Sequence, residues 1–240
     1  MGDVNENTQW LNDYLAGGFD KVGGWVDKGV FAYVVMMDRV LQARNVQGGI
    51  CEIGVHHGRF FIPLNSLCTS EAAISVALDV FEDQNLNIDK SGSGDRQLFE
   101  NNLQIYDKFR GRNVRTLTGD STVTKPETLL NAAGHSFKIV SIDGGHTAEH
   151  TISDLELAAS IVTPGGFVMV DDILNRHWLG VMDGVTTYLR RRPTLWPLAI
   201  GFNKLIFCNM SVHQAYSSAF TQMYKFQKTT HLCGYPILSH

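Results

Sequence analysis

The chain has 240 residues, 44% of them hydrophobic, and a formal net charge of −4 at pH 7, which suits one large α/β domain with a substantial core. The acidic balance and the lack of a basic run argue against a nucleic-acid partner, and no apolar run is long enough for a membrane span. Four scattered cysteines and a polar N-terminus predict a reduced, cytoplasmic protein.

The first 47 residues are expected to be helical and to precede the sheet. A short helix is predicted around residues 10–15, and residues 30–44 carry apolar side chains at helical spacing. We predict an N-terminal helical lid or cap over residues 1–47 and a second domain over residues 48–240. Plain packing of these helices on the sheet edge is an equal alternative.

Short apolar runs alternate with helical patterns through the rest of the chain. Five strands separated by helices, then two strands joined by a tight turn, predict a doubly wound, mostly parallel α/β sheet of seven strands, Rossmann-like, with a C-terminal antiparallel hairpin. The tail after residue 225 is expected to be irregular. The predicted strands are residues 50–54, 74–78, 113–118, 137–142, 167–170, 196–201 and 205–208.

A glycine-containing turn follows the first predicted strand. Gly54 and Gly58 stand where the backbone can approach a ligand closely and where the next helix adds a partial positive charge. This spacing alone is weak, because it lacks the third glycine of a dinucleotide fingerprint. Asp79 ends the next strand 21 residues after Gly58, a position suited to ribose hydroxyls, although it also suits a strand-end cap. Together the two features predict adenosine binding.

Three carboxylates follow two further predicted strands. Asp143 ends the apolar run 137–142, and Asp171 and Asp172 end the run 167–170. If these strands are parallel neighbours, the carboxylates meet at the sheet edge where ligands bind in open α/β folds. Oxygen ligands of this kind suit Mg²⁺, Mn²⁺ or Ca²⁺. The alternative is a strand-end and helix-capping role.

His146 lies three residues after Asp143, at the start of the next predicted helix. Its unperturbed pKa near neutrality suits a general base that takes a proton from a hydroxyl group, and the alternative is a capping or packing histidine. His146 and His150 also fit the His-x-x-Glu-His pattern of some zinc peptidases. No third zinc ligand is evident, so a zinc peptidase is a remote alternative.

In this order and spacing the motifs resemble the class I S-adenosylmethionine-dependent methyltransferases. The similarity extends over residues 48–209. Within that superfamily the chain is most similar to the metal-dependent O-methyltransferases that modify sugars of macrolide and aminocoumarin antibiotics. The residues that carry the resemblance are Glu52 to Gly58, Asp79, Gly119-Asp120-Ser121, Ile142 to His146 and Pro164-Gly165-Gly166.

The resemblance implies a role for each matching residue. Some sugar enzymes place an Asp base two residues after the first metal-binding Asp. Gly145 occupies that position here, which leaves His146 as the candidate base. The implied cofactor-binding residues are Glu52, Gly54, Gly58, Asp79, Asp120, Ser121 and Asp143, and the implied ligands of Mg²⁺ or Mn²⁺ are Asp143, Asp171 and Asp172.

The resemblance therefore predicts an S-adenosylmethionine-dependent O-methyltransferase that acts with divalent-metal assistance on a small-molecule hydroxyl acceptor, such as a sugar or a glycosylated natural product. A metal-independent methyltransferase and a hydroxylase-like relative of the same fold are the alternatives. No nucleic-acid or membrane partner is expected, and a homo-oligomer is left open. Arg59, Arg176 and Lys204 are candidates for binding an anionic acceptor, such as a nucleotide-linked sugar, although solvated surface charges are the simpler interpretation.

Overall fold

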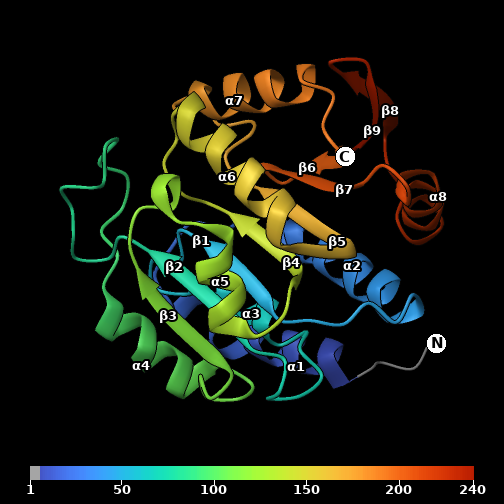
Figure 1. Ribbon diagram of the computed structural model, residues 1–240. Coiled ribbons are helices and arrows are strands. Elements are labelled where there is room, and N and C mark those ends of the chain that lie inside the picture. Colours follow the sequence, from blue (N-terminus) through green and yellow to red (C-terminus); the bar gives the residue numbers. More distant parts are fainter. Residues whose placement is uncertain (1–5) are drawn as a thin grey trace.

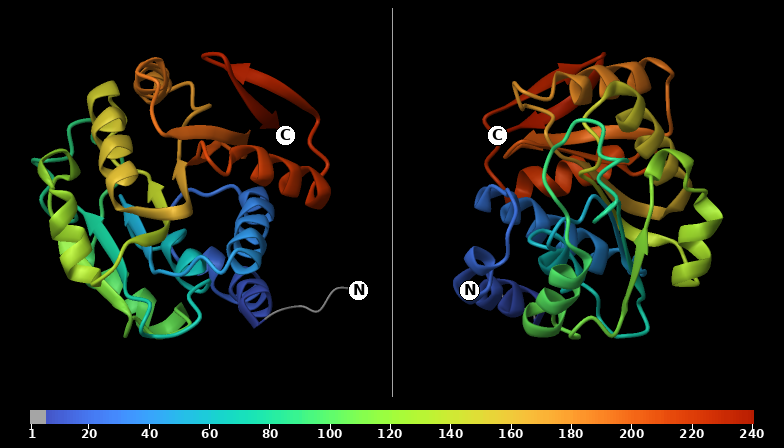
Figure 2. Two further views of the ribbon diagram at one scale, coloured as in Figure 1. Left: turned by 45° about the vertical axis from the view of Figure 1, so that its right-hand side comes forward. Right: turned by 90° about the vertical axis from the view of Figure 1, so that its left-hand side faces the viewer.

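The computed structural model describes residues 6–240, which form a mixed sheet with helices on both faces (Figure 1 and Figure 2). The strand order is β3-β2-β1-β4-β5-β7-β6-β9-β8. All seven predicted strands are confirmed, but the predicted strand number is wrong, because the sheet has nine. The strands are β1 (Ile50–Ile53), β2 (Ser75–Asp79), β3 (Val114–Thr118), β4 (Phe137–Ile142), β5 (Val162–Val170), β6 (Leu195–Gly201), β7 (Lys204–Asn209), β8 (Lys228–Leu232) and β9 (Tyr235–Ser239).

The first five strands run parallel, and β7 is inserted antiparallel between β5 and β6. The central strands are apolar on both faces because each face packs against helices. In β5, for example, Phe167 and Met169 belong to one core while Val168 and Val170 belong to the other. Because β1 to β5 run parallel, their carboxyl ends lie along one edge of the sheet.

Two helical layers complete the fold. In Figure 2 the helices α5, α6 and α7 cover one face of the sheet, and α1 and α2 lie on the other together with α3, α4 and α8. No helix within residues 6–240 is long and apolar enough to cross a membrane. The helices are α1 (Glu6–Gly17), α2 (Phe31–Ala43), α3 (Phe61–Asn65), α4 (Arg96–Tyr106), α5 (Pro126–Ala133), α6 (Ala148–Ile161), α7 (Leu179–Arg190) and α8 (His213–Met223).

The two N-terminal helices share the core of the sheet. Leu11 and Tyr14 of α1 and Tyr33 of α2 are buried in the same cluster as Ile139 of β4. The segment 23–27, between these helices, lines the cavity described below. The division into a cap over residues 1–47 and a domain over 48–240 stays a prediction.

The prediction of an irregular tail is wrong. Residues 228–239 form a hairpin in which β9 pairs with β6, so that Ala199 lies opposite Leu238. The turn at Cys233 and Gly234 has positive φ angles of 51° and 87° at both positions, which suits a two-residue hairpin. Strand β8 lies at the edge and is largely exposed, so its sequence carries little of the alternation that marks a half-buried strand.

Asp154 is a buried acid in α6. Its side chain is fully buried, and neither carboxylate oxygen has a hydrogen-bond partner within residues 6–240. Burial disfavours the charged form and raises the pKa of Asp154 from 3.8 to about 7. Between these two pH values the folded protein keeps a proton that the unfolded chain has released, so stability falls as the pH rises.

We expect Asp154→Asn to remove this loss of stability at high pH. The variant should be on the order of 2–4 kcal/mol more stable than the parent at pH 8, where the parent carries a buried charge, and similar to it at pH 4. Urea unfolding at the two pH values measures the difference. Asp183→Asn, at an exposed position of α7, is the control and should change little. If Asp154→Asn increased the free energy of unfolding no more at pH 8 than at pH 4, the raised pKa of Asp154 would be contradicted.

Candidate active site

A cavity of about 550 Å³ opens at the carboxyl ends of β1, β2, β4 and β5. Such an edge is the usual ligand site of open α/β sheets. Of the predicted site residues only Gly58 does not line it. The predicted residues that do line it are Glu52, Gly54, Asp79, Asp120, Ser121, Asp143, His146, Asp171 and Asp172.

The glycine turn after β1 is required by close packing. Gly54 has a φ of +82°, and a Cβ there would collide with the carbonyl oxygen of Asp143 at the end of β4. Gly58 has a φ of +92°, and a Cβ there would lie 2.9 Å from the ring of Phe99. Gly54 thus lets the ends of β1 and β4 converge at the cavity. Gly58 lets the turn pack against Phe99, on the side away from the cavity.

Asp79 holds this turn against the end of β2 through hydrogen bonds. Its carboxylate accepts the backbone N–H of His56 at 2.8 Å and of Phe81 at 2.7 Å. Asp120 acts similarly, since it accepts both the backbone N–H and the hydroxyl of Thr122, at 2.8 and 2.7 Å. Both acids therefore hold loops in place as well as lining the cavity.

Glu52 lies beneath the turn and is fully buried. Ser141 donates its hydroxyl to Oε1 of Glu52 at 2.8 Å, while Oε2 finds no partner in the described part of the chain. Burial raises the pKa of Glu52 to about 8, and the charge of Lys204 opposes the rise. The base of the cavity therefore holds an acid that is neutral over much of the physiological range.

The acidic cluster, meaning Asp143, Asp171 and Asp172, is brought together as predicted at the ends of β4 and β5. Asp171 forms a buried ion pair with Lys204, which begins β7 and is only 2% exposed. The Lys204 ammonium also lies 4.3 Å from the centre of the Phe60 ring. Sequence reasoning missed this pair because its partners are 33 residues apart.

Asp143 has no comparable partner. No hydrogen bond reaches its carboxylate from residues 6–240, and burial followed by the nearby charge of Asp171 holds its pKa well above the usual range. An unsatisfied carboxylate of this kind is suited to a cation.

Asp172 is fixed in a strained backbone conformation, with a φ of +59°. Asn175 and Asn203 donate to its Oδ1 at 2.9 and 2.7 Å, and its Oδ2 lies 2.8 Å from Nε2 of His146. Three neighbouring segments thus hold this carboxylate in one orientation. Neither amide was predicted, because each acts from an irregular connection.

His146 is held on both ring nitrogens. Asp89, in the loop before α4, lies 2.7 Å from Nδ1 and also accepts the His146 backbone N–H at 2.7 Å, while Asp172 faces Nε2. The imidazole stacks on Trp178, with ring centres 4.4 Å apart. Burial disfavours the imidazolium, but the hydrogen bonds to Asp172 and Asp89 outweigh it and raise the pKa of His146. Asp89 lies in a polar loop in which no sequence signal marked it.

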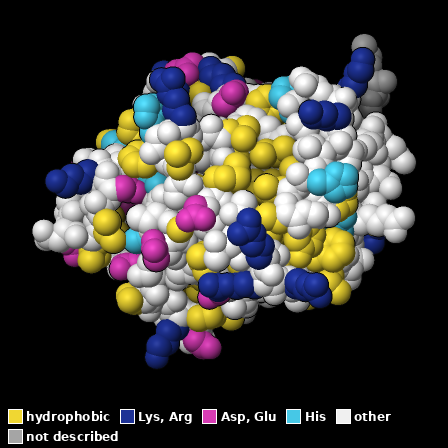
Figure 3. Space-filling view, turned by 90° about the horizontal axis from the view of Figure 1, so that it is seen from above, with side chains coloured by type: hydrophobic (Ala, Val, Ile, Leu, Met, Phe, Trp, Pro, Cys, Tyr) yellow, Lys and Arg dark blue, Asp and Glu magenta, His cyan; other side chains and the backbone are white. Residues whose placement is uncertain are grey.

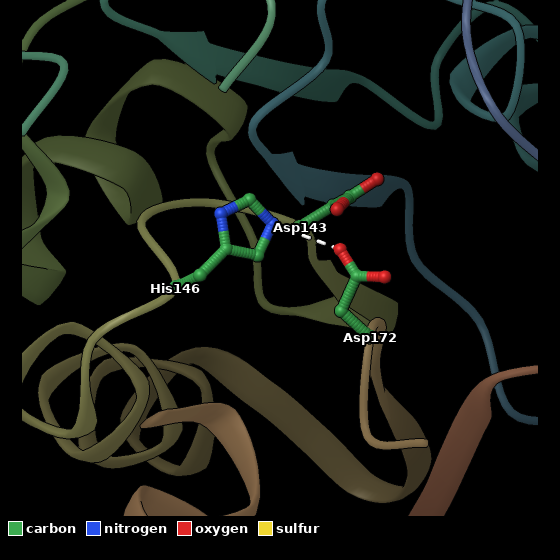
Figure 4. Close-up of side chains that lie close together, drawn as sticks. All are labelled: Asp143, His146 and Asp172. Carbon is green, nitrogen blue, oxygen red and sulfur yellow. Dashed lines mark ion pairs between the residues drawn. The ribbon is translucent and has the colours of Figure 1, made fainter. Parts of the chain in front are cut away.

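Asp143, His146 and Asp172 converge in Figure 4, and one donor atom from each lies within 4.8 Å of the others. Two carboxylates and one imidazole fit a divalent cation, and the unpartnered Asp143 supports that fit. This set contains His146 in place of the predicted Asp171. His150 is not in the set, and its Nδ1 lies 2.8 Å from the Thr147 hydroxyl, which gives the zinc-peptidase pattern no support.

The candidates for binding an anionic acceptor are engaged elsewhere or lie outside the cavity. The Arg59 guanidinium contacts the carbonyl of Gly24 and pairs with Asp20 at 3.1 Å. Lys204 is buried against Asp171, and Arg176 is exposed and does not line the cavity.

A family model described as a methyltransferase domain matches residues 51–173, about half of the chain. Comparison of the sequence with curated proteins gives no match. Among solved structures, the O-methyltransferase NovP is 18% identical, with a TM-score of 0.59 over 74% of this chain and 78% of its own.

Two further structures have the same fold. CalS11, a TDP-rhamnose 3′-O-methyltransferase of calicheamicin biosynthesis, is 19% identical, with a TM-score of 0.53 over 85% of this chain and 93% of its own. An O-methyltransferase from Bacillus cereus in complex with SAH is 15% identical, with a TM-score of 0.58 over 83% of this chain and 89% of its own. The similarity to methyltransferases, and the Rossmann-like fold that it implies, are confirmed.

The ion pair between Lys204 and Asp171 gives a stability prediction. Lys204→Met should destabilise the protein by about 3–5 kcal/mol at pH 7.5, because it leaves Asp171 buried without a counter-charge. Adding Asp171→Asn should restore much of the loss, which a double-mutant cycle of urea unfolding measures.

Lys28→Met is the matched control. It breaks an ion pair with Asp20 in which the two side chains are 52% and 72% exposed, so stability should barely change. Equal effects of the two lysine substitutions would show that the buried ion pair stabilises the protein no more than the exposed one.

Proposed function

The chain belongs to the methyltransferase-domain family, and on that premise we propose that it transfers the methyl group of S-adenosylmethionine to a hydroxyl oxygen of a small molecule. The observation that carries the proposal is one cavity that joins the glycine turn and Asp79 to the cluster of Asp143, His146 and Asp172. A methyl donor and a site for preparing an acceptor then share one space. Methyl transfer from an activated sulfonium chiefly needs such alignment.

The cofactor half is proposed from the lining residues. Gly54 leaves room beside the methionine part, Asp79 faces the ribose, and Asp120 with Ser121 borders the adenine. All four line the cavity. The hydrogen bonds that Asp79 and Asp120 accept from neighbouring backbone N–H groups support the proposal, since they fix the cavity wall before a ligand binds.

A divalent cation, Mg²⁺ or Mn²⁺, is proposed at the acidic cluster. Asp143 and Asp172 would hold it, and the third donor is either Asp171, if Lys204 gives way, or His146. A cation there supplies positive charge that makes a nearby hydroxyl more acidic. Oxygen donors alone favour Mg²⁺, whereas a histidine donor shifts the preference toward Mn²⁺.

His146 is proposed as the group that takes the acceptor's proton. Asp89 accepts the Nδ1 proton, so Nε2 is the atom that would take the acceptor's proton, once Asp172 turns from Nε2 to the cation and the ring is neutral. Trp178 stacks on the ring and restricts its rotation. A ring held in this way is pre-oriented for proton transfer. A metal-independent transferase would use the same histidine without the cation.

The first experiment tests the cofactor site. Asp79→Ala should weaken S-adenosylmethionine binding in calorimetry about 10- to 100-fold, because a carboxylate that receives ribose hydroxyls is lost. The control is Asp83→Ala, at an exposed position that does not line the cavity. Unchanged affinity in a folded Asp79→Ala protein would remove Asp79 from the site.

The second experiment separates a base from a metal ligand at His146. His146→Ala should lose about 10²- to 10⁴-fold in turnover while it keeps its affinity for S-adenosylmethionine and for Mn²⁺. Lost Mn²⁺ affinity would instead make His146 a ligand. His177→Ala, at an exposed position outside the cavity, is the control.

The same assay tests the cation itself in the parent enzyme. EDTA should abolish turnover and Mg²⁺ or Mn²⁺ should restore it. Full turnover after exhaustive chelation would defeat the metal part of the proposal and leave the metal-independent alternative.

A further inference from the structure

The turn between β6 and β7 is a strained two-residue connection at the cavity. Phe202 and Asn203 have φ angles of +53° and +61°, and both residues line the cavity. Positive φ at both positions matches the twist of a hairpin, but it is unfavourable for a bulky side chain such as that of Phe202. Backbone strain of this kind persists only where the surroundings enforce it. The contacts of the two side chains therefore have to hold the turn in place.

Asn203 joins the turn to the segment that follows β5. Its side-chain amide donates to Oδ1 of Asp172 at 2.7 Å, and its side-chain oxygen accepts the backbone N–H of Leu174 at 3.0 Å. Asp172 itself has a φ of +59°, so two strained positions are tied to each other. Asn175 also donates to Oδ1, at 2.9 Å. Because Oδ1 is anchored in this way, Oδ2, which lies 2.8 Å from His146, is the oxygen that can turn to a cation.

Phe202 is enclosed by side chains from three other segments. A Cβ on Gly29 would collide with its ring, and the Tyr33 ring of α2 has its centre 5.3 Å away. The imidazole of His240 stacks on the ring, with the two centres 4.3 Å apart. These contacts oppose any rotation of the strained turn.

His240 is held in its turn by the sheet. It follows β9, whose parallel pairing with β6 places Ser239 opposite Ile200, and Figure 1 shows this end of the chain beside β6. The backbone N–H of His240 donates to the carbonyl of Ile200 at 3.1 Å, and its Nδ1 lies 2.6 Å from the Tyr224 hydroxyl. The β8–β9 hairpin thus sets one ring directly behind the turn that contacts Asp172.

A docking role for the β8–β9 hairpin has less support. The hairpin lies at the top of Figure 1, and Figure 3 shows the face seen from above. That face carries interspersed Lys, Arg, Asp and Glu side chains around apolar ones, with no large area of one charge. A charged partner generally meets a surface of opposite sign. The contacts with the β6–β7 turn are therefore the better guide to what the hairpin does.

We propose that the turn 202–203, backed by His240, is a positioning element that fixes Asp172 for the divalent cation. Asn203 acts through the Asp172 carboxylate, and His240 acts one step further back, through the ring of Phe202. The inference rests on the proposed function and on its cation. It gives a role in the site to β8 and β9, which lie outside the seven strands that the sequence predicts.

The first test removes the amide without adding strain to the turn. Glycine adopts a positive φ readily, so Asn203→Gly should remain folded, which circular dichroism checks. Its affinity for Mn²⁺, measured by calorimetry on protein loaded with S-adenosylhomocysteine, should fall about tenfold, because hydrogen-bond partners of metal ligands typically contribute about 10- to 100-fold. Its affinity for S-adenosylhomocysteine should not change.

Asn45→Gly is the matched control. Asn45 has a φ of +52°, is exposed and does not line the cavity, so this substitution should leave Mn²⁺ affinity unchanged. Unchanged Mn²⁺ affinity in Asn203→Gly overturns the inference, as does an equal loss of affinity for S-adenosylhomocysteine. Absence of Mn²⁺ binding in the parent overturns it together with the proposed cation, whereas absence of S-adenosylmethionine binding would overturn the proposed function.

The second test leaves the residues of the turn intact. His240→Ala should weaken Mn²⁺ binding several-fold, and His240→Phe, which keeps a stacking ring, should restore most of the loss. His231→Ala, at an exposed position of β8, is the control and should change nothing. Equal effects of the two alanine substitutions, or no recovery in His240→Phe, would remove His240 from the positioning element.

Discussion

The buried ion pair between Lys204 and Asp171 is the interaction on which the acidic edge of the sheet depends. Parallel strands β1, β4 and β5 end side by side and bring several carboxylates into a space of low polarity. Without a counter-charge these groups would repel one another. Strand β7 supplies the charge, since its antiparallel pairing places Leu205 opposite Val170 and so sets Lys204 beside Asp171.

A second constraint connects the loop before α4 to the same edge. Asp89 contacts both the backbone and the ring of His146, and His146 in turn contacts Asp172. The loop, the start of α6 and the end of β5 are therefore coupled through one imidazole. Displacement of the loop would free the ring, so the geometry of the proposed base depends on loop closure.

Burial and charge give the site two regions of different chemistry. The base of the cavity holds several carboxyl groups and suits a divalent cation, whereas the exposed apolar side chains of Trp25 and Ile88 line another part of it. Glu52 limits the cost of the acidic base, because burial keeps it neutral until the pH approaches about 8. Because Glu52 is neutral below that pH, the site contains one fewer buried charge, and the desolvation penalty on folding is smaller.

The sequence by itself determined the alternating architecture, the glycine turn at Gly54 and the convergence of Asp143 with Asp171 and Asp172, because apolar periodicity and strand-end residues are local signals. Only the tertiary structure decided that Lys204 pairs with Asp171, that Asp89 holds His146, and that the tail adds β8 and β9. These features are contacts between residues far apart in the chain. Such contacts depend on strand order and loop closure, which no local pattern records.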